Sequence, residues 1–300
     1  MKEIHEFRIF KDYYHLLPQP NNAKFNGAAY VINIAKTDPL FKEIGVLDNE
    51  VKEKNNQHIF GFWDVKRSYS KKELTDAELF HLSVVVAFEP TGEECGTIYD
   101  EEVACEICGV NRKQVGILKL KKGSIPKKDI ARTIAGEIVV SERFVTTFKK
   151  RGLVGIVFKP VAFGNEISNY YQLITSSNDL ELTGKTLTGV NPFNFSTEST
   201  EASEFSISGG YEVRFQKEVY RCPNGHTIGA RILSEPYIRN TPSINAFDFF
   251  ASKQRVGVKQ GLLRPEPIYL CSPAFKKMVE EEKLSGFEFE IAHIIKQPEL

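Results

Sequence analysis

The sequence predicts an α+β fold made of two pseudo-repeats, each a strand–helix–strand unit with a cysteine knuckle, behind an N-terminal α/β extension. Residues 138–161 align without gaps on residues 269–292, and each copy has the pattern of a strand, a helix and a second strand. A CxxCG knuckle precedes the first copy, and a Cys-x3-His segment precedes the second. A chain of 300 residues also exceeds the common size of a single domain, which favours a duplicated or two-domain protein.

Matching caps, glycines and apolar periodicity define the repeat. Ser141 aligns with Ser272, and each serine precedes a helix whose free backbone N–H groups its side chain can cap. Gly155 aligns with Gly286 at the start of the final strand. The alternative explanation is convergence of two ordinary strand–helix–strand units. Because the caps, the glycines and the periodicity match together, duplication is the interpretation that the sequence favours.

The N-terminal part has start signals for two further helices. Asp38 followed by Pro39 is typical of a helix start, and Ser70 with Glu73 matches a capping box. Trp63 lies in a short aromatic segment that we expect to be a strand. The predicted organisation is an N-terminal α+β region over residues 1–94, a first repeat with the CxxCG knuckle over residues 95–164, and a second repeat with the Cys-x3-His knuckle over residues 165–300. The polar run at residues 196–203 is the best loop candidate.

The composition indicates which cellular compartment and which kind of binding partner to expect. Lys+Arg and Asp+Glu both number 39, so the basic surplus typical of nucleic-acid-binding proteins is missing. No apolar run approaches the roughly 20 residues that a membrane span needs, and the first residues lack a signal-peptide core. These observations predict a cytoplasmic protein without a membrane partner. In that reducing compartment the five cysteines are expected to bind metal or to be buried rather than to form disulfides.

The cysteine spacing predicts a structural zinc site. Cys105 and Cys108 are two residues apart, so both thiolates can bind one tetrahedral ion, and Gly109 permits the tight turn. Cys222 and His226 form a second pair with workable ligand spacing. The preferred assignment is one Zn²⁺ bound by all four residues, joining the two repeats. Four protein ligands would close the coordination sphere and leave no position for a catalytic water.

Other assignments of the cysteines remain open on sequence alone. Cys95 is an alternative third or fourth ligand, and the knuckle could instead be metal-free, either as buried thiols or as a relic. A redox CxxC would be expected at a helix N-terminus, whereas a glycine and the polar run NRKQ follow Cys108. Cys271 lies in an apolar strand pattern and is expected to be a buried small side chain.

Two local segments carry a resemblance to known families. The CxxCG knuckle followed by VVSERF (139–144) and GLVGIVFKPV (152–161) resembles the bacterial double-CXXCG motif proteins. The strand–helix–strand segment is also similar to immunity proteins of polymorphic toxin systems. The resemblance spans residues 95–163 and, more loosely, 215–293. Cys105, Cys108, Gly109 and Cys222 match the family motif, whereas Gly225 stands where its second CxxC has a cysteine.

The resemblance implies a non-catalytic protein that binds and neutralises a cognate toxin. The sequence itself contains no nucleophile motif such as GxSxG. One rival hypothesis is an enzyme with a cleft between the repeats, lined by Glu137, Glu142, Arg143 and Asp248. Another is a zinc ribbon that presents basic residues to nucleic-acid phosphates, namely Arg112, Lys113, Lys119, Lys121 and Lys122. The sequence does not predict the oligomeric state.

Overall fold

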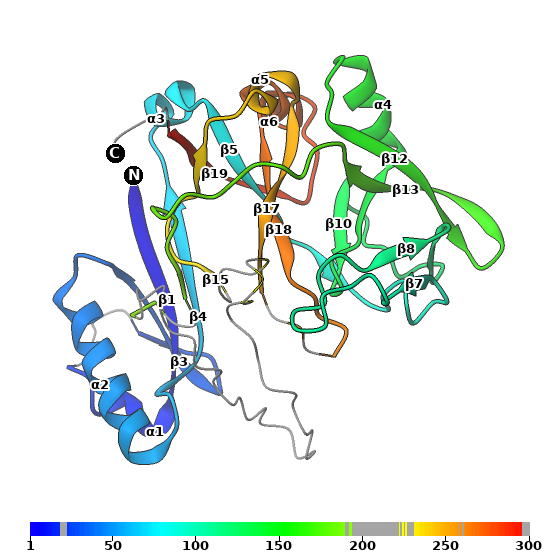
Figure 1. The fold of residues 1–300 in the computed structure, drawn as a ribbon. Coiled ribbons are helices and arrows are strands. Elements are labelled where there is room, and N and C mark those ends of the chain that lie inside the picture. Colours follow the sequence, from blue (N-terminus) through cyan, green and yellow to red (C-terminus); the bar gives the residue numbers. More distant parts are fainter. Residues whose placement is uncertain are drawn as a thin grey trace. The chain divides into compact units, whose positions relative to one another are not determined.

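The protein is a mixed α/β chain in which strands predominate among the described residues. The computed structural model describes residues 1–18, 23–189, 192–193, 222, 224, 226, 231–257, 259 and 261–295. They form two compact units, unit 1 (Met1–Asp76 with Asn191–Phe195) and unit 2 (Ala77–Val190 with Ser196–Leu300), drawn in Figure 1. The loop candidate at residues 196–203 lies outside the described residues. None of the helices in the described ranges combines the length and the apolar character that crossing a membrane requires.

Unit 1 contains a four-stranded antiparallel sheet and one long helix. The strands lie in the order β2-β3-β1-β4. The elements of unit 1 are β1 (Lys2–Phe10), α1 (Lys11–Tyr14), β2 (Lys24–Phe25), β3 (Ala29–Ala35), α2 (Pro39–Asn55), β4 (Phe60–Ser68) and α3 (Lys71–Asp76). The predicted strand around Trp63 and both predicted helix starts are confirmed. The Asp38 carboxylate accepts from the Leu40 N–H at 3.0 Å, and Ser70 and Glu73 bond each other's backbone amides.

Helix α2 is fixed to the sheet by an apolar face and one buried carboxylate. Phe41, Ile44 and Val51 recur at helical spacing and are buried. Asp48 on the same face is also fully buried, and its Oδ1 accepts from the Ile59 N–H at 2.9 Å. That bond satisfies the backbone N–H of the residue before β4, so the buried side chain joins the helix to the sheet.

The core of unit 1 is completed by a side chain from much later in the chain. The Phe193 ring stacks on Phe7 with centroids 5.4 Å apart and also contacts Phe41 and Phe60. A Cβ added to Gly45 would lie 2.7 Å from the Phe193 ring, so the helix can approach the ring only because this residue is glycine. Residues 192–193 therefore belong to unit 1, although the neighbouring strand in sequence belongs to unit 2.

Glu3 on β1 gives unit 1 a specific pH dependence. Its carboxylate lies 3.0 Å from His5 Nε2 and accepts from Arg67 Nε at 3.0 Å. Burial raises the pKa of Glu3, but the bond to His5 and the charges of Arg67 and Lys36 outweigh burial and lower it from 4.5 to about 2. The folded state thus favours the ionised carboxylate. This stabilisation is complete above the unfolded pKa of 4.5 and is lost as the pH falls through about 2.

We therefore expect Glu3→Gln to lower the free energy of unfolding at pH 7 by about 2 kcal/mol, and to reduce the loss of stability between pH 5 and pH 2. Chemical denaturation across that pH range measures both effects. Glu43→Gln replaces an exposed carboxylate on α2 and is the matched control, expected to leave the pH profile unchanged. Equal pH profiles for the wild type and Glu3→Gln would contradict this assignment.

In the part of unit 2 that the structure describes there are two large sheets, of six and five strands, and two small ribbons. The sheet orders are β6-β10-β11-β13-β12-β9 and β16-β19-β5-β18-β17, and the ribbons are β7-β8 and β14-β15. The elements of unit 2 are β5 (Leu79–Val84), β6 (Ala87–Phe88), β7 (Ile98–Asp100), β8 (Lys113–Val115), β9 (Leu118–Leu120), β10 (Ile130–Thr133), β11 (Ile138–Ser141), α4 (Glu142–Lys150), β12 (Ile156–Phe163), β13 (Glu166–Thr175), β14 (Thr188–Gly189), β15 (Arg231–Ile232), β16 (Tyr237–Arg239), α5 (Ser243–Ala246), β17 (Phe249–Val256), β18 (Glu266–Cys271), α6 (Pro273–Glu281) and β19 (Phe287–Ile295).

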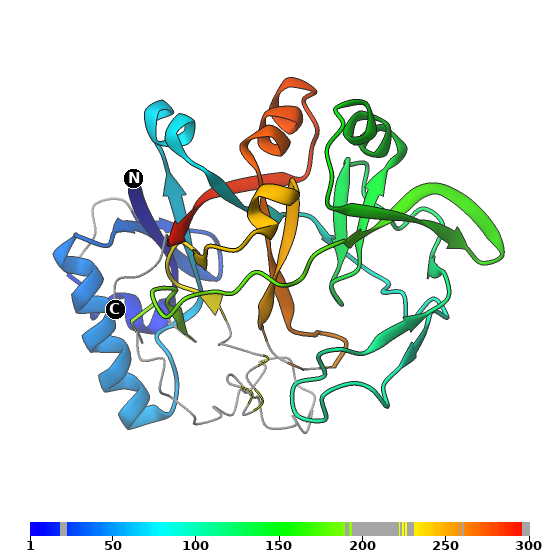
Figure 2. The same ribbon diagram turned by 45° about the horizontal axis from the view of Figure 1, so that its top comes forward.

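Helices α4 and α6 lie side by side, as Figure 2 shows. Both predicted serine caps are present: Ser141 Oγ accepts from the Phe144 N–H, and Ser272 Oγ accepts from the Phe275 N–H, each at 3.1 Å. The Phe144 and Phe275 rings are fully buried, with centroids 6.1 Å apart. The two amphipathic helices thus share one aromatic core.

Strand β5 explains why unit 2 begins before the predicted boundary at residue 94. β5 lies inside the five-stranded sheet, where it pairs antiparallel with β18 and β19. Its pairing partners are almost two hundred positions later in the sequence. Unit 1 therefore ends at Asp76, because the next strand pairs with strands of unit 2.

Candidate metal centre

The first half of the site is a turn at the end of a two-stranded ribbon. Strands β7 and β8 pair from Ile98↔Val115 to Asp100↔Lys113, and the intervening loop carries Cys105 and Cys108. The Cys105 N–H donates to the Val110 carbonyl, and the Gly109 N–H donates to the Cys105 carbonyl, both at 2.8 Å. Gly109 has φ +68°, which is in the left-handed region that glycine adopts without strain. The tight turn holds both thiols on one side of the loop.

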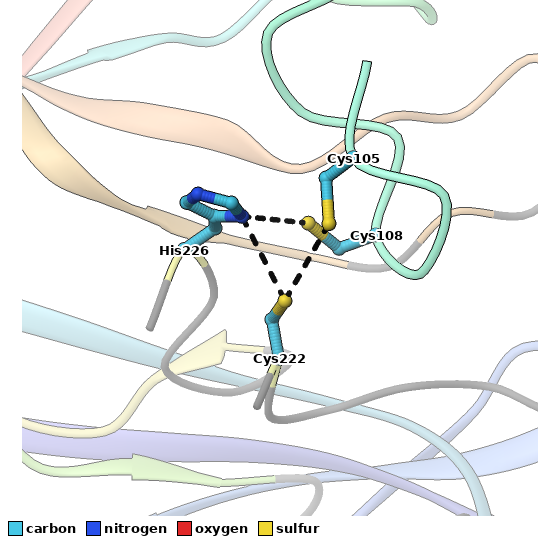
Figure 3. A group of neighbouring side chains, drawn as sticks. All are labelled: Cys105, Cys108, Cys222 and His226. Atoms are coloured by element: carbon cyan, nitrogen blue, oxygen red, sulfur yellow. Dashed lines mark hydrogen bonds between the residues drawn. The ribbon is translucent and has the colours of Figure 1, made fainter. Parts of the chain in front are cut away.

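The second half of the site comes from a loop about 114 positions further along the chain. Cys222 and His226 point toward Cys105 and Cys108, and Figure 3 shows the four side chains converging. The His226 carbonyl accepts from the backbone N–H of Arg255 on β17 at 2.8 Å, which anchors this loop to the five-stranded sheet. The position of Gly225 lies outside the described residues.

The separations between donor atoms match a tetrahedral metal site. The Sγ atoms of Cys105 and Cys222 are 3.8 Å apart, and His226 Nδ1 lies 3.8 Å from the sulfur of Cys108 and from that of Cys222. All four donor atoms lie within 4.8 Å of one another. Ligands about 2.3 Å (sulfur) and 2.0 Å (nitrogen) from a tetrahedral Zn²⁺ would be about 3.5–3.8 Å apart. A disulfide needs sulfurs at about 2.05 Å, so the observed spacing fits a shared ion and not a bond between thiols.

The chemistry of the turn prepares Cys105 as a thiolate. The backbone N–H groups of Cys108 and Ile107, with contributions from His226 and Asn224, lower the pKa of the Cys105 thiol from 9.0 to about 6, although burial opposes this. Asn224 Nδ2 lies 3.6 Å from the Cys105 sulfur. Because a metal ligand must be the thiolate, less free energy is needed to remove the proton before an ion binds.

The site is largely shielded from water. Cys108 and Cys222 are 1% and 2% exposed, and with Val110 they form a small apolar cluster. Cys105 packs on its edge and is partly exposed. An ion bound here would be coordinated by protein atoms in a dry environment, as structural metal ions are.

The four predicted ligands are thus brought together, and the group does not include Cys95. Cys95 lies in a turn where its N–H bonds to the Thr91 and Gly92 carbonyls, and burial raises the pKa of its thiol. Cys271 is fully buried on β18, which confirms its prediction as a small apolar side chain.

The residues of the rival enzyme hypothesis have separate structural partners. The buried Glu137 carboxylate accepts from Tyr99 Oη at 2.5 Å and from Thr133. Asp248 bonds Ser272 and the Val154 N–H, at 2.7 and 3.0 Å. Among the other residues of that hypothesis, Arg143 is bonded to Asp129 and the Glu282 carbonyl, and Glu142 is exposed.

Arg112, the one arginine of the proposed nucleic-acid surface, is engaged in contacts within the protein. Arg112 Nη1 donates to Glu93 at 2.9 Å and to Glu101 at 3.2 Å, and its guanidinium lies 3.9 Å from the Tyr99 ring centroid. These contacts neutralise the charge and leave the side chain 9% exposed. The lysines of that set lie on or beside β8 and β9, and basic side chains on an edge strand such as β9 also discourage pairing with other chains.

Sequence reasoning missed the basic residues next to the site. Arg255 lies near Cys108, and Lys259 and Arg264 approach the turn at Gly109. They come from the end of β17 and the segment after it, which carry no local motif, so no pattern could have identified them. No protein-family model matches this chain, and no curated protein is significantly similar to it.

Proposed function

We propose that this chain is a non-catalytic protein-binding protein whose fold is stabilised by one structural Zn²⁺. The observation that carries the metal assignment is the four-donor cluster of Cys105, Cys108, Cys222 and His226, with donor separations of a tetrahedral site. Three thiolates and one imidazole favour Zn²⁺ over hard ions such as Mg²⁺ or Ca²⁺. Four protein ligands complete the shell, so the ion would stabilise structure rather than activate water. The need for reduced thiols supports a cytoplasmic location.

We also propose that unit 2 is an internal duplication, with one knuckle in each copy. The strand order β10-β11-β13-β12-β9 has the counterpart β17-β18-β5-β19-β16. In each series the last pair, β12 with β9 or β19 with β16, is parallel, and the preceding pairs are antiparallel. Convergence of two simple units would not be expected to reproduce the order and direction of five strands.

Equivalent side-chain hydrogen bonds support the duplication. Asp129 Oδ1 accepts from Ser141 Oγ at 3.0 Å, and Asp248 Oδ1 accepts from Ser272 Oγ at 2.7 Å. The other oxygen of each aspartate reaches the opposite copy: Asp129 Oδ2 accepts from the Ser285 N–H at 2.8 Å, as Asp248 accepts from Val154. Each copy thus caps its own helix and binds the turn of its partner.

A pair of threonines repeats in the same way next to each ribbon. Thr97 Oγ1 accepts from the Lys119 N–H at 2.8 Å and donates to the same residue's carbonyl at 3.2 Å. Thr186 Oγ1 does the same with Tyr237, at 2.9 and 3.2 Å. Both threonines are buried, so each hydroxyl satisfies two backbone groups that would otherwise lack partners.

The proposed copies exchange a strand. β5 is the first strand of the first copy but lies in the sheet of the second, whereas β13 is the first strand of the second copy and lies in the sheet of the first. With residues 79–163 and 166–295 as the two copies, each lends one strand to the other. In this arrangement the metal would be a second link between copies, because each knuckle supplies two ligands.

The outward face of the β7–β8 ribbon supports protein binding. Ile98 and Val115 are directly paired, and their side chains are 64% and 51% exposed. On the opposite face, Tyr99 and Gln114 bond Glu137 and Gln172. The hydrogen bonds on the opposite face fix the ribbon, and an exposed aliphatic pair on a fixed ribbon is suited to binding a protein partner. Val103 and Ile107 in the same loop are also exposed, beside the carboxylates of Glu102 and Glu106, which favours a partner with basic groups.

The resemblance to immunity proteins suggests a toxin as that partner, and co-expression tests it. Cells that produce a toxin encoded beside this gene are expected to survive when the wild-type protein is present. Ile98→Asp/Val115→Asp should abolish protection and binding while retaining the metal. Val157→Asp, at an exposed apolar position on β12, is the matched control and should protect normally. Absence of binding and of protection by the wild type would contradict the toxin-neutralising proposal.

A further inference from the structure

The charge of the proposed metal centre requires compensation by groups outside the four ligands. Three thiolates, one neutral imidazole and one divalent ion have a net charge of −1. Cys108 and Cys222 are almost fully buried, so water solvates this charge poorly. An uncompensated charge in such a place is strongly destabilising, and buried charges in proteins are normally paired.

The end of β17 and the segment after it place three cationic residues next to the proposed metal centre. A Cβ added to Gly109 would lie 3.0 Å from Lys259 Cδ and 3.4 Å from Arg264 Cδ, so both side chains run along the turn that follows Cys108. Arg255 is partly buried, its backbone N–H donates to the His226 carbonyl, and its side chain lies near Cys108 and also near Tyr269 and Glu266. Lys259 and Arg264 therefore lie at the first knuckle, and Arg255 lies between Cys108 and the backbone of the second.

Arg264 carries a second observation. Its side chain is only 14% exposed, and its Nη1 donates to the carbonyls of Gly261 and Leu263 at 2.5 and 2.9 Å, which fixes the guanidinium. Its Nε is buried, and no acceptor lies within hydrogen-bonding distance in the part of the chain that the structure describes. Its Nη2 forms a long ion pair with Glu101 at 4.0 Å, and that carboxylate also accepts from Arg112 at 3.2 Å. Because Glu101 is shared with Arg112 and lies at 4.0 Å, it neutralises the charge of Arg264 only in part.

We propose that Arg255, Lys259 and Arg264 form a cationic collar around the metal centre, and that this collar keeps the thiolates bound to the ion and unreactive. The proposal rests on the metal assignment above. Positive charge outside the ligand shell offsets the net negative charge of the loaded centre, so the bound state is favoured over loss of the ion. It also withdraws electron density from sulfur, which lowers the nucleophilicity of the bound thiolates. Together these effects favour a structural centre over one that reacts with electrophiles.

Metal affinity and thiolate reactivity of single variants test the collar. Arg255→Met, Lys259→Met and Arg264→Met retain much of the aliphatic stem and remove the charge. Each is expected to weaken Zn²⁺ binding about 10- to 100-fold in competition with a chromophoric chelator at pH 7. Each should also speed alkylation of the zinc-loaded protein by iodoacetamide. Arg255→Lys and Arg264→Lys should restore most of both properties, which a purely steric role would not predict.

A spectroscopic readout separates charge from folding. In Co²⁺-loaded protein, removal of a nearby cation should shift the sulfur-to-metal charge-transfer band to longer wavelength, while the tetrahedral ligand-field bands stay unchanged. Lys253→Met is the matched control, because Lys253 is on β17 but pairs with Glu181 at 3.3 Å and is 68% exposed. Wild-type affinity, reactivity and spectra in all three Met variants would overturn the collar while leaving the metal centre intact. A wild-type protein that binds no Zn²⁺ would instead overturn the proposed metal centre itself.

Discussion

Cys222→Ser is expected to abolish stoichiometric zinc binding and to lower the free energy of unfolding of unit 2 by about 3–5 kcal/mol. Loss of one ligand leaves a three-donor site, and the stabilisation that a bound ion gives the folded state rises with the logarithm of its affinity. The loss should be large because Cys222 connects two segments that are far apart in sequence. For a unit of this size the thermal midpoint should fall by roughly 6–20 °C.

Cys95→Ser is the matched control, since Cys95 is not part of the donor group. Its zinc content should equal that of the wild type, and its thermal midpoint should change by no more than about 2 °C. Addition of a strong chelator should lower the midpoint of wild type and Cys95→Ser but not that of Cys222→Ser. A Cys222→Ser protein with full zinc content and wild-type stability would contradict the assignment of this ligand.

Gly286→Ala is expected to destabilise unit 2 by about 4 kcal/mol or more. Gly286 has φ +102°, and an added Cβ would clash with the backbone carbonyl oxygen of Ile130 on β10. The clash is with a backbone atom, so no side-chain rotation can relieve it. The Ser285 carbonyl also accepts from the Asp129 and Ile130 N–H groups at 3.1 and 3.2 Å, which holds the two backbone segments together. Relief of both the unfavourable φ and the overlap would require the backbone before β19 to move away from β10.

A second glycine separates the two causes. Gly152 has φ +66° with nothing within 4 Å of an added Cβ, so Gly152→Ala should cost only about 1–2 kcal/mol from the backbone conformation. Gly155→Ala should resemble Gly286→Ala, because its Cβ would clash with the Phe249 carbonyl oxygen. Urea denaturation of the three variants measures the difference. Equal destabilisation by Gly152→Ala and Gly286→Ala would mean that the overlap with the Ile130 backbone contributes nothing to the loss of stability.

Local features of the fold could be predicted from sequence because the residues that determine them are adjacent. Asp38, Ser70, Ser141 and Ser272 each cap the helix that follows, and their side chains reach amides only two or three residues away. The CxxCG turn is equally local. The pairing of its two thiols with Cys222 and His226 followed from ligand number, since a tetrahedral ion needs four donors.

The partners of strands could not be predicted in the same way. β5 pairs with β18 and β19, and nothing local in the sequence of Leu79–Val84 specifies these neighbours. The boundary expected at residue 94 therefore missed the true end of unit 1. Phe193 could not be assigned to unit 1 for a similar reason, because its position depends on the space above Gly45. The cations near the metal centre are likewise brought there only by the folded chain.

The most direct test of the account is X-ray absorption spectroscopy, with elemental analysis, on protein purified without added metal. We predict one zinc per chain with three sulfur neighbours at about 2.3 Å and one nitrogen at about 2.0 Å, with no oxygen neighbour. Absence of metal, or a zinc ion with a water oxygen in its first shell, would contradict the closed structural centre formed by Cys105, Cys108, Cys222 and His226.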